Sequence, residues 1–185
     1  MQNIILIGFM GAGKTTIGIK LSYALRIPMD DTDKMIEARQ NRKISDIFAT
    51  DGEDAFRKME TDLLQELLQK KEKREEEVKN GVRKTMVGAY ILSVGGGLPL
   101  REENRTLLKQ IGKVVFLRAK PETIYERVKH DTTRPLLQCD DPFAKICELM
   151  NSRKDKYEAA ADVIIDVDDK NFEEILLEIK NSVSK

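Results

Sequence analysis

Residues 4–15 are Ile4-Ile5-Leu6-Ile7-Gly8-Phe9-Met10-Gly11-Ala12-Gly13-Lys14-Thr15, and the topology of the chain follows from them. The first four residues are aliphatic and end at a glycine, which is typical of a buried parallel strand. The remainder fits the phosphate-loop pattern G-x-x-x-x-G-K-[ST]. Apolar residues at helical spacing then predict a helix that starts near Lys14 and ends before Pro28. This arrangement predicts a strand–loop–helix unit that binds phosphate.

The glycines and two side chains of this loop suit the chemistry of a nucleotide phosphate. Glycine lets successive backbone N–H groups turn toward phosphate oxygens, and the following helix adds its positive dipole end. The Lys14 amine can reach the β- and γ-phosphates, and the Thr15 hydroxyl can ligate Mg²⁺. The competing interpretation is a flexible glycine turn, but the matched strand and helix argue against it. We expect phosphate contacts from Gly11, Ala12, Gly13, Lys14, Thr15 and Thr16.

Short apolar runs and amphipathic segments alternate along the rest of the chain. Strands are predicted at Tyr90–Val94, Val114–Leu117, Val163–Ile165 and, briefly, near Met29. Helical stripes of apolar residues are predicted at Phe56–Leu68, Ile124–Val128 and Phe172–Val183. Strands that alternate with helices predict an α/β fold, with a parallel sheet covered on both faces.

Composition excludes several classes of function. A length of 185 residues favours a single domain spanning 1–185. Because 32 Lys and Arg balance 32 Asp and Glu, we expect binding neither to nucleic acid nor to an anionic membrane surface. The run Thr85–Leu100 is too short and glycine-rich to cross a bilayer, and no signal peptide is predicted. Cys139 and Cys147 fit no metal-ligand spacing and indicate reduced thiols of a cytoplasmic protein.

Two short segments that follow predicted strands are candidates for ligand binding. Asp31 and Asp33 alternate at a strand end, so both carboxylates are expected to point toward the carboxyl edge of the sheet, where α/β folds bind ligands. One can hold Mg²⁺ through water while the other accepts a hydrogen bond or proton from a substrate hydroxyl. In isolation, such a cluster more often caps a helix or turn. Gly95-Gly96-Gly97 either admits a ligand close to the backbone or forms a mobile turn.

The default explanation for the other charged residues is a solvated surface. From Lys70 to Lys79 the only apolar residue is Val78, and charge pairs at four-residue spacing favour a solvated extension of the preceding helix over a partner-binding surface. A solvated surface position is likewise the default explanation for Arg57, His130, Arg134 and Arg153, each taken by itself.

Taken in order, these residues resemble the shikimate kinase family over most of the chain. The phosphate loop is common to many nucleotide enzymes, whereas the ordered set of the other motifs is far more specific. The segment 70–87 is longer and more charged than the family pattern, and Val167-Asp168-Asp169 matches the adenine loop weakly. The motifs beyond the phosphate loop are Asp31-Thr32-Asp33, Ile44–Phe48, Gly52-Glu53, Phe56-Arg57, Ser93–Gly97, Thr133–Leu137, Arg153 and Tyr157.

The resemblance implies a P-loop kinase fold like that of nucleoside monophosphate kinases. Such a fold has a five-stranded parallel sheet between helices and a mobile lid, here at about 129–141, with the charged insertion at about 70–87. The implied reaction transfers the γ-phosphoryl group of ATP to the 3-hydroxyl of shikimate, in aromatic amino-acid biosynthesis. ATP is then the co-substrate, Mg²⁺ the metal, and the protein a cytoplasmic monomer.

The resemblance also implies a role for each matching position. Arg127 would lie against adenine, and the planar forks of Arg57 and Arg153 suit the carboxylate of shikimate. The catalytic residues would be Lys14, Asp33 and Arg134, the last also meeting the phosphates. The metal would be held by Thr15 and, through water, Asp31. Shikimate would be held by Asp33, Arg57, Gly95, Gly96, Gly97 and Arg153.

Two alternatives stay open at this point. Paired arginines can also hold a phosphate, so a P-loop kinase for another small acceptor, such as gluconate or a nucleotide, is one. A non-catalytic nucleotide-binding module is the other. Against it, the chain lacks the Asn-Lys-x-Asp and Asp-x-x-Gly motifs of GTP switches and retains Lys14, Asp33 and Arg134.

Overall fold

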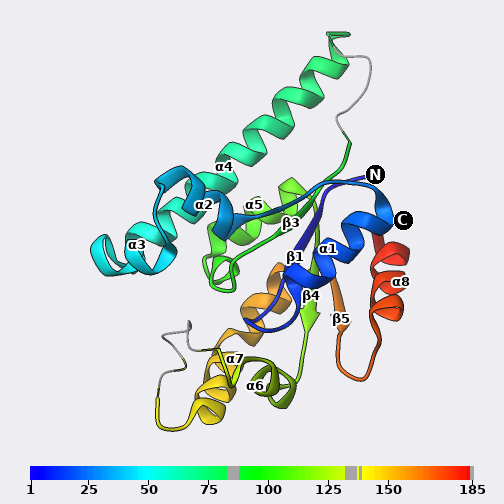
Figure 1. Cartoon of the computed structure of the whole chain (residues 1–185). Coiled ribbons are helices and arrows are strands. Elements are labelled where there is room, and N and C mark those ends of the chain that lie inside the picture. The colour runs from blue at the N-terminus through cyan, green and yellow to red at the C-terminus, as the bar shows by residue number, and fades with distance from the viewer. Residues whose placement is uncertain (83–87, 132–136, 138, 184–185) are drawn as a thin grey trace.

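The computed structural model of the chain describes residues 1–82, 88–131, 137 and 139–183. Its centre is a five-stranded sheet in the order β2-β3-β1-β4-β5, with every neighbouring pair parallel (Figure 1). The predicted parallel sheet is therefore confirmed. The strands are β1 (Ile4–Ile7), β2 (Met29–Asp31), β3 (Ile91–Ser93), β4 (Lys113–Arg118) and β5 (Val163–Asp166).

The central strand forms where the sequence is continuously apolar. All four residues of β1 are fully buried, and Ile5 pairs with Leu92 on one side and Val114 on the other. A strand buried on both faces needs no polar alternation, which explains the aliphatic run. β3 is shorter than the predicted Tyr90–Val94. The two outer residues of that prediction still form hydrogen bonds with β1, because Tyr90 O accepts from Ile4 N and Val94 N donates to Leu6 O.

Helices cover both faces of the sheet. Helices α1 and α8 contact each other on one face, while α5 and α7 contact each other and β4 on the opposite face. Their buried side chains join the strands in one core. The helices are α1 (Lys14–Leu25), α2 (Thr32–Gln40), α3 (Ile44–Thr50), α4 (Gly52–Lys79), α5 (Glu102–Ile111), α6 (Pro121–Val128), α7 (Pro142–Ala160) and α8 (Phe172–Val183), with the short 3₁₀ helix η1 (Leu98–Leu100).

Helix α4 is much longer than the others and leaves the body of the protein. Its first half packs Phe56 and Leu63 against α2 and α3, and Leu64 joins the main core. The charged residues Lys70–Lys79 continue the same helix, as the sequence predicts, and none of residues 70–82 is buried. In Figure 1 this end of α4 projects away from the edge of the sheet at which α6 lies.

None of the helices in the described ranges combines the length and apolarity that a bilayer crossing requires. Cys139 is exposed, Cys147 is half-buried, and both are free thiols.

Candidate active site

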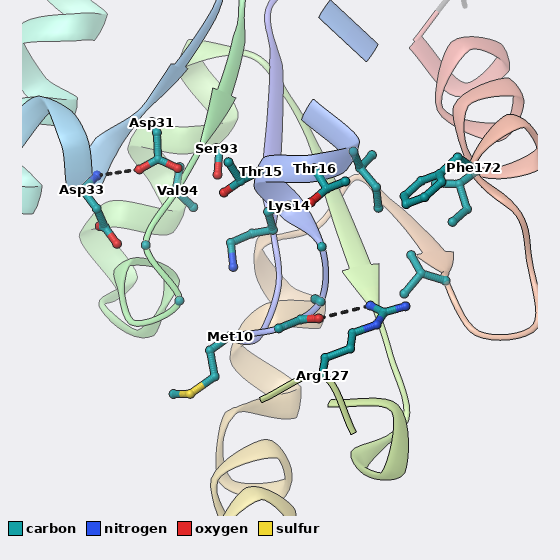
Figure 2. A pocket seen from close by; sticks show the side chains of 18 of the residues that line it. Met10, Lys14, Thr15, Thr16, Asp31, Asp33, Ser93, Val94, Arg127 and Phe172 are labelled. Carbon is teal, nitrogen blue, oxygen red and sulfur yellow. Dashed lines mark hydrogen bonds between the residues drawn. The ribbon is translucent and has the colours of Figure 1, made fainter. Parts of the chain in front are cut away.

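A cavity of about 660 Å³ lies at the carboxyl ends of the central strands (Figure 2). The phosphate loop and the start of α1 form its middle, the ends of β2 and β3 one side, and the start of α8 the other. This is the edge at which parallel α/β sheets bind ligands, because loops there separate neighbouring strands. The sequence-predicted residues that line the cavity are Gly11, Ala12, Gly13, Lys14, Thr15, Thr16, Asp31, Asp33, Gly95, Gly96 and Arg127.

The phosphate loop is shaped to receive an anion. Gly13 caps α1 with a φ of 93°, a left-handed conformation that glycine adopts without steric cost. The first residues of the helix that starts at Lys14 line the cavity, so its positive dipole end lies there. The Lys14 amine extends over the loop, where Nζ donates hydrogen bonds to the carbonyl oxygens of Gly8 (2.9 Å) and Phe9 (3.2 Å).

Asp31 and Asp33 both reach the cavity, but not as the sequence predicts. Asp31 ends β2, and its Oδ1 caps α2 by accepting hydrogen bonds from the backbone N–H groups of Asp33 (3.1 Å) and Lys34 (3.4 Å). Asp33 stands in the first turn of that helix, so the predicted strand-like alternation is wrong. The strand ends at Asp31 because the carboxylate of that residue satisfies the first N–H groups of a helix.

The surroundings of Asp33 disfavour the ionised form of its carboxyl group. Burial, with the neighbouring charge of Asp31, raises the pKa of Asp33 to about 6, although Lys14 and Arg57 oppose the shift. Its Oδ1 is buried and has no hydrogen-bond partner in the described part of the chain. A carboxylate with this pKa is poised to exchange a proton near neutral pH.

Gly95–Gly97 follow β3 and form what we call the glycine wall. Because these residues have no side chains, they leave room for charged side chains from other elements. A β-carbon at Gly97 would collide with the guanidinium of Arg57, so the absence of a side chain there allows Arg57 to lie against the backbone. Arg57 in turn donates to Glu60 Oε2 (2.8 Å) and Glu53 Oε1 (2.9 Å). Glycine at this position therefore leaves the space that the Arg57 guanidinium occupies.

Glu60 is a site residue that the sequence analysis missed. Its side chain is 0% exposed, and burial raises its pKa to about 7, with Asp33 adding to the shift and Arg57 opposing it. The sequence signal for Glu60 was its position three residues after Arg57, because residues three apart lie on the same face of a helix.

Arg153 approaches the same glycine segment from α7. Its guanidinium lies 5.6 Å from the centre of the Phe9 ring. Tyr157 donates to the carbonyl oxygen of Gly96 (2.5 Å). Burial raises the pKa of Tyr157 to about 12, while the charges of Arg153 and Arg57 both lower it. The fold thus places Arg57 beside Gly97, and it places Tyr157, on the helix that carries Arg153, beside Gly96. Neither arginine lines the cavity itself.

The end of the cavity beside α6 and α8 is lined by an arginine and an aromatic ring. Arg127 on α6 donates to the carbonyl oxygen of Gly11 (3.1 Å), as Figure 2 shows. Phe172 belongs to the apolar stripe predicted for the last helix, and in the structure it is 44% exposed and lines the cavity. The Nζ of Lys20 lies 4.5 Å from the centre of its ring. The sequence signal for Phe172 was its place just after the weakly matching Val167-Asp168-Asp169 loop.

Arg134 lies outside the described residues, as do residues 132–136 and 138 of the expected lid at about 129–141. The described residues hold no group of three or more His, Cys, Asp or Glu side chains that could bind a metal.

Comparison with known proteins identifies the family. A family model described as shikimate kinase matches residues 10–184. The shikimate kinase of Bacillus mycoides is 40% identical over 185 residues, covering 100% of both chains. A shikimate kinase from Acinetobacter baumannii, solved in complex with shikimate, superposes with a TM-score of 0.82 at 33% identity, covering 98% of this chain and 92% of that one.

A more distant likeness concerns the fold alone. A gluconokinase from Sinorhizobium meliloti superposes with a TM-score of 0.51 at 15% identity, covering 99% of this chain and 91% of that one. The five-stranded parallel sheet and the phosphate loop are thus those of P-loop kinases. The full-length match and the ordered motifs agree, and the chain belongs to the shikimate kinase family.

Proposed function

We propose that this kinase transfers the γ-phosphoryl group of ATP to the 3-hydroxyl of shikimate, giving shikimate 3-phosphate and ADP for aromatic amino-acid biosynthesis. One observation carries the proposal: a single cavity joins a phosphate loop to Asp33 and to a glycine wall beside two arginines. The first part suits the phosphates of ATP, and the second suits a small acceptor with a carboxylate and hydroxyl groups.

At the nucleotide end, we assign the phosphates to the loop. The backbone from Gly11 to Gly13, with Lys14, Thr15 and Thr16, would surround the phosphate oxygens. Arg127 and Phe172 flank the end of the cavity where adenine would lie, offering a guanidinium and a ring face for stacking. By family resemblance, Arg134 would approach the phosphates as the lid closes.

At the acceptor end, we assign the carboxylate to Arg57 and Arg153. The positive charges of both lower the pKa of Tyr157 against the effect of burial, and two planar forks can hold the two oxygens of one carboxylate. Asp33 and the backbone of Gly95, Gly96 and Gly97 would hold the hydroxyl groups.

The reaction then needs one proton acceptor and one bond exchange. The acceptor hydroxyl oxygen forms a bond to the γ-phosphorus, the bond from that phosphorus to the leaving oxygen of ADP breaks, and the hydroxyl proton passes to the Asp33 carboxylate. The Lys14 amine neutralises charge that develops on the phosphoryl oxygens. Because Asp33 has a pKa of about 6, it is mostly ionised at neutral pH and able to take the proton.

The residues present fit a magnesium ion held together with ATP. The Thr15 hydroxyl and the Asp31 carboxylate face the same cavity, and hard oxygen ligands suit Mg²⁺, which usually keeps several waters and binds one or two carboxylates plus substrate phosphates. When bound, the ion would supply positive charge that stabilises the phosphates. Thr15 would contact it directly and Asp31 through water.

The decisive experiment measures ADP release with shikimate, gluconate, nucleoside monophosphates and the methyl ester of shikimate as acceptors. We expect turnover with shikimate and little with the ester, which lacks the negative charge. Arg57→Ala and Arg153→Ala should each lower kcat/KM for shikimate by at least about thirtyfold, because breaking such a pair costs about 2–5 kcal/mol. Arg39→Ala is the control, since Arg39 pairs with Glu66 on the exposed surface.

Three results would contradict the proposal. Phosphorylation of gluconate or a nucleotide without phosphorylation of shikimate would assign another acceptor. Equal rates for shikimate and its ester would remove the carboxylate from recognition. Equal losses in Arg39→Ala and the two site variants would make the effect nonspecific.

We also propose that the protein acts as a cytoplasmic monomer without a nucleic-acid or membrane partner. Its zero formal charge and free cysteines support this. Light scattering at micromolar concentration tests the monomer, for which a mass near 21.1 kDa is expected.

A further inference from the structure

A second cavity, of about 250 Å³, lies apart from the one that contains the phosphate loop. The end of β4, the start of α6 and the middle of α7 form it, and these elements lie together in Figure 1. We call it the aromatic cavity, because the rings of Phe9, Phe116 and Tyr157 are among its walls. The two cavities have no described lining residue in common, so the proposed reaction leaves this one without a role.

The walls of the aromatic cavity are fixed by packing within the protein. Phe116 and Tyr157 are stacked with ring centres 5.1 Å apart, and neither these two residues nor Phe9 is more than 6% exposed. The hydroxyl of Tyr157 is held by the carbonyl oxygen of Gly96. Because an apolar cavity of about 150 Å³ accommodates benzene, a preformed space of about 250 Å³ can accommodate one substituted ring.

The charged side chains that line the aromatic cavity are all positive among the described residues. They are Arg118 and Lys154. Arg118 is already paired with Asp166 and Glu158. Lys154 is exposed and forms neither a hydrogen bond nor an ion pair with the described part of the chain. The exposed amide of Asn151 precedes it by three residues, on the same face of α7, and also lines the cavity.

A ligand that suits this cavity combines a flat apolar body with one negative group. A ring that lies against the aromatic walls is stabilised by burial of apolar surface and by ring–ring contact. A carboxylate attached to that ring would meet two hydrogen-bond donors, the Lys154 ammonium and the Asn151 amide. A positively charged ligand is disfavoured, because it would meet two cations and no lining acid among the described residues.

We propose that the aromatic cavity is a second ligand site of this kinase and binds a monocyclic aromatic carboxylate, with its ring against the aromatic walls and its carboxylate at Lys154. This site differs from the one that we assign to shikimate, because neither Arg57 nor Arg153 lines it. The two sites are adjacent through Phe9, whose ring centre lies 5.6 Å from the Arg153 guanidinium.

Alkylation of Cys147 by iodoacetamide reports occupancy of the aromatic cavity, because this half-buried thiol lines it. The probe is 3-phenylpropionate, added to the full-length protein, and peptide mass spectrometry gives the alkylation rate of each cysteine. With the probe at about ten times its Kd, Cys147 should react about tenfold more slowly, because only the unoccupied fraction reacts. Cys139 is the internal control: it is exposed, lies outside the lining, and should react at an unchanged rate.

Two further probes separate the ring from the charge. Acetate carries the charge without the ring and should give no protection at the same concentration. 3-Phenyl-1-propanol carries the ring without the charge and should bind about twofold to fivefold more weakly than 3-phenylpropionate, as expected for the loss of an exposed ion pair. Protection by acetate, or equal affinity for the alcohol, would overturn the assigned ligand class.

Three variants test the position of each group, with binding of 3-phenylpropionate measured by ligand-observed NMR. Lys154→Gln should weaken binding to the level of the alcohol. Lys156→Gln is the matched control, since it removes another exposed lysine of α7 that does not line the cavity. Cys147→Phe places a ring in the cavity and should abolish binding. All three variants should keep the wild-type kcat, because none of these residues lines the reaction cavity.

Saturating shikimate distinguishes this site from the acceptor end of the reaction cavity. Protection of Cys147 that persists with shikimate supports a second site. Protection that shikimate abolishes would place the probe at the acceptor end and overturn the inference, while the proposed function stands. An unprotected Cys147, or equal affinity of Lys154→Gln and the wild type, also overturns it. If Cys147→Phe does not fold, thiol protection and the two lysine variants still decide the outcome.

Discussion

Tyr157 on α7 donates its hydroxyl to the carbonyl oxygen of Gly96 at 2.5 Å and so ties the helix that carries Arg153 to the glycine wall of the cavity. The Tyr157 ring stacks on Phe116 of β4, with ring centres 5.1 Å apart. The hydroxyl therefore has a fixed position, and it links the two parts of the site that would hold an acceptor.

Tyr157→Phe should weaken this link without disturbing the stacked ring. One lost hydrogen bond in a buried site costs about 1 kcal/mol, so the free energy of unfolding should fall by that amount. We expect KM for shikimate to rise severalfold while KM for ATP is unchanged. Denaturant titration and initial rates measure both effects. A stability and a KM equal to those of the wild type would show that the hydrogen bond contributes nothing.

Gly97→Ala should displace Arg57, because a methyl group there would occupy the position of the guanidinium. Misplacement of a binding group by about 1 Å can cost on the order of a hundredfold, so kcat/KM for shikimate should fall by about tenfold to a hundredfold. Gly88→Ala is the matched control, since among the described residues, its chain neighbours aside, no atom lies within 4 Å of a β-carbon there. Similar losses in both variants would contradict a specific collision with Arg57.

Lys14→Ala should abolish most of the turnover and leave the fold intact. The amine projects over the phosphate loop, and loss of a group that stabilises developing charge costs about 10²–10³-fold in kcat. Lys58→Ala, which removes an exposed lysine paired with Asp62, should keep the wild-type rate. Activity of Lys14→Ala within tenfold of the wild type, with unchanged circular dichroism, would remove Lys14 from the chemical step.

Glu60 should make the stability of the protein depend on pH. Its pKa rises from an ordinary value of 4.5 to about 7 on folding, so the folded state favours the protonated form. The stabilising contribution is complete below about 4.5 and is lost as the pH rises through about 7. Relative to Glu60→Gln, the unfolding free energy of the wild type should fall by up to about 3 kcal/mol across this range. Urea titrations at several pH values measure the difference. Parallel pH profiles for the two proteins would contradict a raised pKa.

Replacement of residues 70–87 by a short turn should leave catalysis nearly unchanged. Lys70 and Gly88, at the two ends of the replaced segment, line the same surface groove. Within the described residues 70–82 no residue is buried, and Lys71 Nζ donates a hydrogen bond to the carbonyl oxygen of Gln110 (2.5 Å). Initial rates and circular dichroism should show wild-type kinetics and a lower helix content. Loss of activity in a folded variant would instead assign this extension to an essential interface.

Much of the fold could be predicted because its causes are local. The aliphatic run Ile4–Ile7 and the glycines after it determine a strand and a phosphate loop from backbone hydrogen bonding and sterics alone. The charged continuation of α4 was predicted from four-residue charge spacing in the same way. Asp33 was misplaced on a strand because a capping carboxylate at Asp31 ended that strand, and a pattern of alternating residues does not distinguish the two outcomes.

The chemistry of the site was decided by the tertiary structure. Arg57 of α4 and Tyr157 of α7 meet the same glycine segment only because the strand order β2-β3-β1-β4-β5 sets that segment beside both helices. The environment of Glu60 likewise depends on α2 and on the segment after β3. Sequence patterns carry the local preference of each element, whereas a pKa or a close approach depends on burial and on distances between elements far apart in the chain. The sequence alone therefore determined the phosphate loop, while only the tertiary structure determined which charges meet beside it.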